Sequence, residues 1–289
     1  MGVKLQTIAD TRRFLASELA DIYSAGEAAA VVSHLLESVA GLSHSEQLRN
    51  GNRRLTPAEK RKISQGLCKL KRHQPVQHIT GYGWFLERRF RVNPGVLIPR
   101  QETEELVMLA LKKTGSAFNG TIIDFCTGSG CIAVTLACLM PEAKIWATDN
   151  SGEALAVAAG NISDYNAHVK LLRHNLLEMN FSGLPRTDIL VSNPPYVRES
   201  EKAFMEPRVL LSEPHEALFV PDEDPLIFYR ALLEALRQLL KPGGWFFLEI
   251  NEALGSELLS LYNQPFLSNT EILNDIHSKN RFICGTRAT

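Results

Sequence analysis

The sequence has few cysteines, and they follow no disulfide or metal-ligand pattern. Its 289 residues include five of them, Cys68, Cys126, Cys131, Cys138 and Cys284, with no CxxC pair. An odd number without such spacing argues against a disulfide framework and against a zinc site. The eight histidines are also scattered without ligand spacing. We therefore expect no structural metal ion.

Long apolar runs are missing as well. No stretch approaches the roughly 20 apolar residues of a membrane span. Residues 1–15 mix Lys4, Asp10, Arg12 and Arg13 with apolar residues, so they contain no signal-peptide core. The composition, 45% hydrophobic and 22% charged, is typical of a globular protein with one large and one small domain. We expect a cytoplasmic protein.

The net charge is close to zero, but it is unevenly distributed. Residues 1–75 contain 12 Lys and Arg against 7 Asp and Glu, a balance of +5, and the remainder has a balance of −6. A basic module on an acidic body can steer an acidic partner or one that lies near RNA. The alternative is that these basic side chains only solvate helix faces.

The N-terminal part of the chain predicts a small helical bundle. Apolar residues recur at three- and four-residue spacing in 11–19 and 27–39. Thr56, Pro57 and Glu59 form a helix start in which Thr56 caps and Glu59 completes a capping box. This helix should reach about Arg72, with an inner stripe of Ile63, Leu67 and Leu70.

A connector and a short hairpin follow the helices. Pro75–Gly83 is expected to be a connector, and the aromatic and β-branched residues of 81–92 predict a hairpin around a polar centre. Val96–Ile98 is extended and ends at Pro99. The expected division is a helical domain over 1–74, a linker with a hairpin over 75–95 and a larger domain over 96–289.

The rest of the chain alternates between strands and helices. Repeated strand–helix alternation predicts an α/β fold with a parallel sheet covered on both faces. An antiparallel hairpin at the end makes the sheet mixed. The expected strands are 121–125, 143–148, 168–172, 187–192, 244–250, 270–276 and 282–287, and the expected helices are 102–113, 130–139, 153–165, 225–240 and 253–262.

Two strand ends predict a nucleoside site. The strand before Cys126-Thr127-Gly128-Ser129-Gly130 leads through this Gly-containing turn into a helix, and the next strand ends in Asp149. Glycines let a backbone approach a ligand, and an acid at that place can accept hydrogen bonds from ribose hydroxyls. The turn is neither the dinucleotide GxGxxG pattern nor a phosphate-binding lysine loop. The alternatives are close helix packing at the turn and a helix-capping role for Asp149.

Asn193-Pro194-Pro195-Tyr196 follows the apolar strand 188–192. The prolines lack backbone donors and fix φ, so the strand should end abruptly beside a stiff wall of acceptors. Such a wall suits a planar NH2 group, which needs two acceptors in its own plane. The alternative is a strand-ending turn with a packed tyrosine.

With these motifs in place, the chain resembles the release-factor glutamine methyltransferases (the PrmC/HemK family) of the class I S-adenosylmethionine-dependent methyltransferases. The Asn-Pro-Pro-Tyr motif is shared with adenine and guanine amino methyltransferases, whereas residues 96–104 separate this family from them. The matching segments are 74–81, 96–104, 124–133, 191–196, 213–218 and 243–250.

The resemblance implies a Rossmann-like seven-stranded mixed sheet in the order 3-2-1-4-5-7-6, with strand 7 antiparallel. It makes residues 1–74 a substrate-recognition domain and residues 96–289 the S-adenosylmethionine-dependent methyltransferase domain. It implies S-adenosylmethionine as cofactor, with S-adenosyl-L-homocysteine as the product left after methyl transfer, and no metal. The implied partner is a class 1 peptide chain release factor, methylated at N5 of the glutamine in its Gly-Gly-Gln loop. The implied cofactor residues are Cys126, Thr127, Gly128, Ser129, Gly130, Asp149, Asn175, Leu176 and Asn193. The implied substrate residues are Leu97, Asn193, Pro194, Pro195 and Tyr196, of which Asn193, Pro194 and Tyr196 are catalytic.

The chain departs from the family pattern at four positions. Cys126 stands where a glycine is usual, and Asn251 replaces the glycine that commonly follows Glu249-Ile250. Asn175 stands where the family often has Asp, and Leu176 where some members have an aromatic residue. The last two positions bear on how the adenine is held.

Two other functions are compatible with the motifs. A nucleic-acid amino methyltransferase uses the same four residues, but it needs base flipping and a phosphate-binding surface. The acidic catalytic half shows no basic patch interleaved with aromatic residues. A protein that binds S-adenosylmethionine without catalysis is the third reading, and the intact Asn193–Tyr196 motif argues against it.

Overall fold

A computed structural model provides the structure of the chain and describes residues 6–289. Residues 1–5, part of the stretch expected to lack a signal-peptide core, lie outside the described residues. The chain divides into two compact units: Met1–Gly81 with Glu206–Ser212, and Tyr82–Met205 with Glu213–Thr289. The expected domain limits remain a prediction. Between residues 6 and 289, none of the helices has the length and apolar character to cross a membrane.

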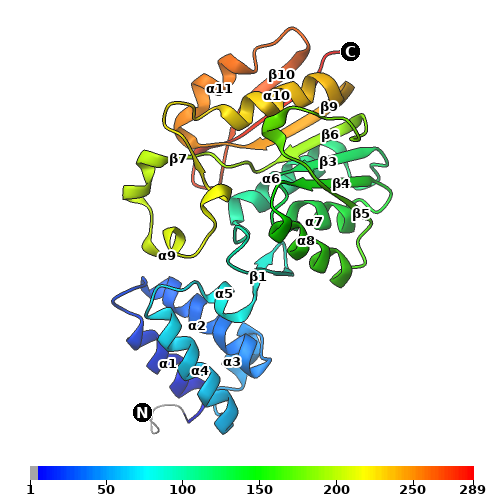
Figure 1. The fold of residues 1–289 in the computed structure, drawn as a ribbon. Helices are drawn as coiled ribbons and strands as arrows, with labels where there is room; N and C mark the ends of the chain where they lie inside the picture. The colour runs from blue at the N-terminus through cyan, green and yellow to red at the C-terminus, as the bar shows by residue number, and fades with distance from the viewer. Residues whose placement is uncertain (1–5) are drawn as a thin grey trace. The chain divides into compact units, whose positions relative to one another are not determined.

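The first unit is the predicted helical bundle. Three of its helices begin with a capping box, at Ser24, Ser43 and Thr56, each paired with a glutamate three residues later. Ile63, Leu67 and Leu70 are buried, which confirms the predicted inner stripe. The helices are α1 (Ile8–Glu18), α2 (Ala25–Ala40), α3 (His44–Arg49), α4 (Pro57–Leu70) and α5 (Val76–Thr80), as labelled in Figure 1.

Two short helices between residues 6 and 81 were not predicted. The expected connector Pro75–Gly83 contains α5, so that assignment was wrong. Helix α5 has five residues and ends at Gly81, whose φ is 83°, and α3 has six. A hydrophobic period cannot be recognised over one turn and a half.

A segment from the second half of the chain belongs to the first unit. Arg208, in α9 (Pro207–Leu210), donates to Glu27 at 2.8 Å, and its guanidinium lies 4.8 Å from the centroid of the Tyr23 ring. The Arg208 side chain holds the pKa of the Glu27 carboxyl down at about 2, together with Ser24. Residues Glu206–Ser212 therefore belong to the first unit, although the residues on both sides of them in the sequence belong to the second.

The second unit opens with the predicted hairpin. Strands β1 (Tyr82–Phe85) and β2 (Arg88–Arg91) pair antiparallel across a turn at Leu86 and Glu87. Phe85 and Phe90 are fully buried and meet edge to face at 5.9 Å.

A seven-stranded sheet forms the centre of this unit, in the order β10-β11-β9-β6-β3-β4-β5. With the sheet strands numbered from β3 onward, and the two-residue strands β7 (Val197–Arg198) and β8 (Phe219–Val220) left out, this is the expected order 3-2-1-4-5-7-6. Strand β11 is antiparallel to β9, as expected. The strands are β3 (Thr121–Phe125), β4 (Lys144–Asp149), β5 (Val169–Arg173), β6 (Thr187–Ser192), β9 (Leu240–Glu249), β10 (Leu267–Asn274) and β11 (Asn280–Arg287).

Helices cover both faces of this sheet (Figure 1). Neighbouring residues of β3 point to opposite faces: Ile122 packs in the core under α6 and α7, whereas Ile123 packs in the core under α10 and α11. The helices are α6 (Gln101–Thr114), α7 (Cys131–Leu139), α8 (Gly152–Asp164), α10 (Ile227–Leu239) and α11 (Gly255–Leu261).

Some boundaries differ from the expectation. Strand β9 begins at Leu240 rather than Gly244, because its first residue pairs with Thr187 before the register shifts. The helix expected over 253–262 is a 3-10 turn, Glu252–Leu254, followed by α11. The two-residue strands β7 (Val197–Arg198) and β8 (Phe219–Val220) were too short to be predicted.

Candidate active site

Three strand ends meet at one edge of the sheet. Strands β3, β4 and β6 are parallel neighbours, with Phe125 level with Thr148 and with Ser192. The turn after β3, Asp149 at the end of β4 and Asn193 after β6 therefore share the carboxyl edge, where open α/β sheets bind ligands.

The turn after β3 is built from left-handed residues. Cys126, Gly128 and Gly130 have φ of 58°, 54° and 80°. Cys126 thus adopts a conformation that glycine takes without strain and that costs other residues about 1–2 kcal/mol. Burial, with the charges of Asp149 and Asp124, raises the pKa of the Cys126 thiol, so it stays protonated and is a poor nucleophile.

Hydrogen bonds fix the turn from below. Thr127 donates from Oγ1 to Asp124 Oδ2 at 2.5 Å and from its backbone to the Thr148 carbonyl at 2.9 Å. Asn161 Nδ2 donates to the Ser129 carbonyl at 2.8 Å. Complete burial, and next the charge of Asp149, raise the pKa of Asp124 to about 7, although Thr127 opposes the shift.

Two buried polar atoms at this turn have no hydrogen-bond partner. They are Asp124 Oδ1 and Ser129 Oγ. The Ala133 backbone amide lowers the pKa of Asp124 and the Ser129 hydroxyl lowers that of Cys131, but neither contact has the geometry of a full hydrogen bond. A Cβ added to Gly128 would meet nothing within 4 Å. The open space beside Gly128 and the unpaired oxygens of Asp124 and Ser129 suit a polar ligand that approaches the backbone of the turn closely.

Asp149 is tied to the same turn. Its Oδ2 accepts from the Gly128 amide and its Oδ1 from the Ser151 amide, both at 2.9 Å. The capping alternative is wrong, because the residue that caps α8 is Ser151, which accepts from the Ala154 amide. Burial raises the Asp149 pKa, while the backbone amides of Ser151, Gly128 and Asn150 lower it. A carboxylate has about four acceptor positions, so further donors such as ribose hydroxyls can still bind.

Asn175 and Leu176 lie just after β5. Asn175 caps a 3-10 turn: its Oδ1 accepts from the Leu177 amide and its Nδ2 donates to Glu178, both at 3.1 Å. The Leu176 side chain is 4% exposed and packs in the core with Phe125. Their contact with adenine stays a prediction.

The Asn193 and Tyr196 side chains converge on one buried carboxylate. Asn193 Nδ2 donates to Thr103 Oγ1 at 3.0 Å, and this hydroxyl donates to Glu249 Oε2 at 2.7 Å. The Tyr196 hydroxyl donates to Glu249 Oε1 at 2.8 Å. Pro194 is buried between these two anchored residues. The motif is therefore held at both ends.

Asn251 helps to hold this motif. Its Nδ2 donates to the Tyr196 carbonyl at 3.1 Å and to Glu201 at 2.9 Å. The departure from the usual glycine at this position therefore adds two hydrogen bonds beside the motif.

Leu97 lies on a segment fixed by Glu213. The Ile98 amide donates to Glu213 Oε2 at 3.1 Å, and Arg100 pairs with Glu213 Oε1 at 2.5 Å. Val96 and Ile98 are buried, whereas Leu97 between them is partly exposed. Its contact with substrate stays a prediction.

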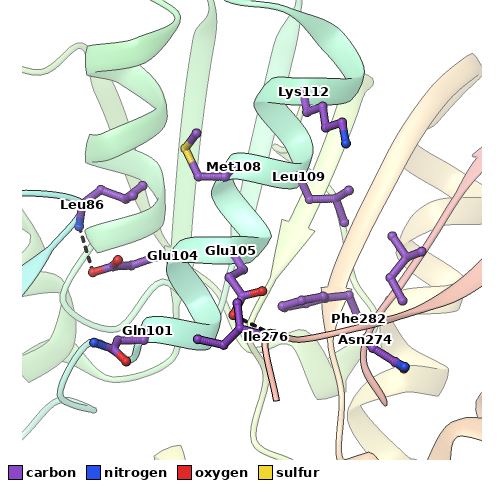
Figure 2. Close-up of a pocket in the computed structure, with 11 residues that line it drawn as sticks. Leu86, Gln101, Glu104, Glu105, Met108, Leu109, Lys112, Asn274, Ile276 and Phe282 are labelled. Atoms are coloured by element: carbon purple, nitrogen blue, oxygen red, sulfur yellow. Dashed lines mark hydrogen bonds between the residues drawn. The ribbon is translucent and has the colours of Figure 1, made fainter. Parts of the chain in front are cut away.

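A surface pocket of about 680 Å³ lies beside α6 and contains none of the predicted site residues. Figure 2 shows Met108 and Leu109 on α6 facing this pocket, with Ile276 and Phe282 from the C-terminal hairpin. Glu104 Oε1 accepts from the Leu86 amide at 2.9 Å, and Glu105 accepts from the Ile276 amide at 3.4 Å. These contacts hold the first turns of α6, which carries Thr103.

Known proteins match the chain over nearly its whole length. Residues 10–81 match the family described as PrmC N-terminal domain, and residues 98–219 match the methyltransferase small domain. A release factor glutamine methyltransferase of Bacteroides thetaiotaomicron is 39% identical over 274 residues, which cover 95% of this chain and 98% of that protein.

The chain belongs to the release factor glutamine methyltransferase family. The Bacillus subtilis release factor glutamine methyltransferase is also 39% identical, over 73% of this chain and 74% of its own. Membership in this family implies S-adenosylmethionine as methyl donor.

Solved structures agree in fold. A methyltransferase from Pyrococcus furiosus has a TM-score of 0.51 at 16% identity and covers 78% of this chain and 100% of its own. The T. thermophilus 16S rRNA N2 G1207 methyltransferase, solved with AdoMet and guanosine, has a TM-score of 0.52 at 16% identity, over 71% of this chain and 49% of its own. At 16% identity, the similarity between these two structures and this chain concerns the fold alone.

Thr103 and Glu249, the two residues that anchor the motif, were not predicted as site residues from the sequence. Both lie inside segments that carried the resemblance, 96–104 and 243–250. A glutamate in the apolar run Trp245–Ile250 was the available signal, because an unpaired charge is seldom buried in a strand.

Proposed function

We propose that the chain transfers a methyl group from S-adenosylmethionine to the side-chain amide nitrogen (N5) of the glutamine in the Gly-Gly-Gln loop of a peptide chain release factor. The observation that carries this proposal is the anchored Asn193 amide at the carboxyl end of β6, in a chain 39% identical to a release factor glutamine methyltransferase. Because release factors act in translation, the proposed location is the cytoplasm.

The turn residues 126–130 and Asp149 are proposed to hold the cofactor. The left-handed turn leaves open space at Gly128, and Asp149 keeps acceptor positions for ribose hydroxyls. Asp124 lies below with an unpaired oxygen. When bound, S-adenosylmethionine supplies an electrophilic methyl group on a sulfonium. Asn175 and Leu176 are proposed to flank the adenine.

Asn193 and Pro194 are proposed to orient the glutamine amide. An amide nitrogen is a poor nucleophile because its lone pair is delocalised into the carbonyl. Asn193 Oδ1 and the Pro194 carbonyl accept the two N–H groups and hold the nitrogen for in-line attack. Positive charge develops on the nitrogen during transfer, so these acceptors bind the transition state more strongly than the substrate.

Tyr196 and Leu97 are proposed to close the substrate site. The Tyr196 hydroxyl is fixed on Glu249, so its ring has a set orientation from which it can pack against the amide plane. Burial, followed by the charge of Glu249, raises the pKa of Tyr196 well above its ordinary value. The tyrosine therefore stays neutral and does not act as a base at physiological pH. The nitrogen can lose its proton after transfer.

The test is incubation of the enzyme and cofactor with a release factor, followed by mass spectrometry. We expect a gain of one CH2 unit on the Gly-Gly-Gln glutamine, and a loss of turnover on the order of 100-fold or more in Asn193→Ala, with cofactor affinity changed less. Tritium transfer to tRNA, rRNA or DNA instead of the release factor would support an amino methyltransferase of nucleic acids. Cofactor binding without transfer to any of them would support a non-catalytic role.

A further inference from the structure

A buried carboxylate lies behind the substrate-facing motif. Glu249, the last residue of β9, is 1% exposed, and its two oxygens accept hydroxyl protons from Thr103 and Tyr196. Thr103, in the first turn of α6, is 3% exposed, and its hydroxyl oxygen accepts a hydrogen bond from the Asn193 side-chain amide. Glu249 thus reaches Asn193 through one hydroxyl group.

The proton positions in the hydrogen-bond series Asn193–Thr103–Glu249 follow from the donors and acceptors that each side chain offers. An ionised carboxylate only accepts, so the single Thr103 hydroxyl proton points to Glu249. The Thr103 oxygen can then only accept from Asn193, and the Asn193 atom at 3.0 Å must be the NH2 group. Among the described residues, no donor is recorded for Asn193 Oδ1, which lies on the other side of the amide.

We propose that Glu249 is a positioning residue that acts through Thr103 to keep the Asn193 amide in the one orientation that presents Oδ1 to the substrate. This inference rests on the proposed function. The reversed amide would face the glutamine NH2 with its own NH2, so two donors would meet and the acceptor would be lost. It would also set Asn193 Oδ1 against the Thr103 oxygen.

The surroundings of Thr103 keep this geometry in place. Glu104 and Glu105, next to it in the same helix, bind backbone amides of the two hairpins that flank α6, as Figure 2 shows for Leu86 and Ile276. The Thr103 hydroxyl therefore stays at its place between Glu249 and Asn193.

The charged and titratable side chains that face Glu249 come from α6, α7, β11 and the Asn193–Tyr196 motif, and they are Glu102, Cys131, Arg281 and Tyr196. Arg281 of β11 lowers the pKa of Glu249 and Glu102 of α6 raises it. Arg281 itself pairs with Asp275 at 3.0 Å. Tyr229 of α10 donates its hydroxyl proton to the Glu249 backbone carbonyl at 3.0 Å and not to the carboxylate.

Protonation of Glu249 would remove the constraint that the Thr103 hydroxyl places on the Asn193 amide. Burial raises the pKa of this carboxyl above its ordinary value, with Thr103, Tyr196 and Arg281 opposing the shift. The protonated acid is a donor, so it can donate to Thr103, whose own proton can then turn to Asn193 Oδ1. The amide is free to reverse in that state. Turnover should therefore fall on the acid side as Glu249 takes up its proton.

The test compares Thr103→Val, Thr103→Ser and Glu249→Gln in the full-length enzyme, with Thr135→Val as a matched control. Thr135 is a fully buried threonine of α7 whose hydroxyl has no partner. We expect Thr103→Val and Glu249→Gln to lower kcat by about 10- to 100-fold, with the Kd of S-adenosylmethionine within about threefold, and Thr103→Ser and Thr135→Val to stay near the parent value.

The pH profile separates positioning from a structural role. Saturating cofactor keeps the effect of Asp124 and Asp149 on cofactor binding out of kcat. Under this condition the parent enzyme should lose kcat as pH falls, and Thr103→Val should lack this acid limb. An unchanged kcat in Thr103→Val would overturn the proposal, as would a failure of Thr103→Ser to restore it.

A measurement without turnover distinguishes failure of this inference from failure of the proposed function. In ¹⁵N-labelled enzyme, the Asn193 side-chain NH2 signal, identified by its loss in Asn193→Ala, should show protection from exchange that disappears in Thr103→Val. Protection in the parent enzyme supports the inference even if the release factor is not methylated. Equal exchange in both would overturn it.

Discussion

Asp149 is the residue on which cofactor affinity depends most directly. Its carboxylate fixes the turn through Gly128 and retains acceptor positions for ribose hydroxyls. We expect Asp149→Ala to raise the Kd of S-adenosylmethionine roughly tenfold, about 1.4 kcal/mol, by titration calorimetry. Glu142→Ala, which removes an exposed carboxylate before β4, is the control and should leave the Kd of S-adenosylmethionine unchanged. An unchanged Kd in Asp149→Ala would show that the ribose assignment is wrong.

Asp124 makes the stability of the protein depend on pH. Its pKa is about 7 in the folded chain, chiefly because of burial, and about 3.9 when unfolded. The folded state therefore binds this proton more tightly, and the contribution of Asp124 to the free energy of unfolding falls as pH rises from about 4 to 7.

The substitution Asp124→Asn removes this titration. We expect the variant to gain stability relative to the parent as pH rises from 5 to 8, with the difference levelling off above the folded pKa. Urea unfolding at each pH measures it, and other titrating groups cancel in the comparison. If the free energy of unfolding changed with pH in the same way in the parent and in Asp124→Asn, Asp124 would be ionised throughout this pH range.

At the scale of elements, helix α2 offers a matched pair of glycines. Gly26 lies in its first turn and Gly41 ends it with a φ of 67°, and a Cβ at either would meet nothing within 4 Å. Only the backbone conformation differs, so Gly41→Ala should lose about 1 kcal/mol of stability, and Gly26→Ala should gain up to about 1 kcal/mol. Chemical denaturation measures both, and a change of the same sign in both would refute the argument.

Elements were predicted well where a local signal exists. The capping box at Thr56 placed the start of α4, and apolar runs placed β3 and β6 to the residue. Helix α5 and the strands β7 and β8 were missed because two to five residues carry no period. Strand β9 begins earlier than predicted because its first residue pairs with β6, and this pairing leaves no pattern in the local sequence.

At the scale of the molecule, the two units have separate cores. One cluster spans Ile8 to Val76 in the helical unit, and the clusters on the two sheet faces lie between Phe85 and Cys284. The predicted cofactor residues all belong to the second unit. A chain that begins at Tyr82 should therefore keep its cofactor site.

We expect the 82–289 chain to bind S-adenosylmethionine with a Kd within about threefold of the full chain, about 0.6 kcal/mol, and to lose methylation of the release factor. Calorimetry and mass spectrometry measure the two properties. A folded fragment, by circular dichroism, that fails to bind the cofactor would show that the helical unit supports the site.

The sequence by itself determined the alternation of strands and helices, the edge of the sheet at which the motifs meet, and, through its resemblance, the strand order. These follow from local periodicity and from the rule that parallel strands bring their carboxyl ends together. Only the tertiary structure decided which way the Asn193 amide faces. That depends on Thr103 and Glu249, which lie 90 residues before and more than 50 residues after it in the chain, and a hydrogen bond between such distant residues leaves no local pattern in the sequence.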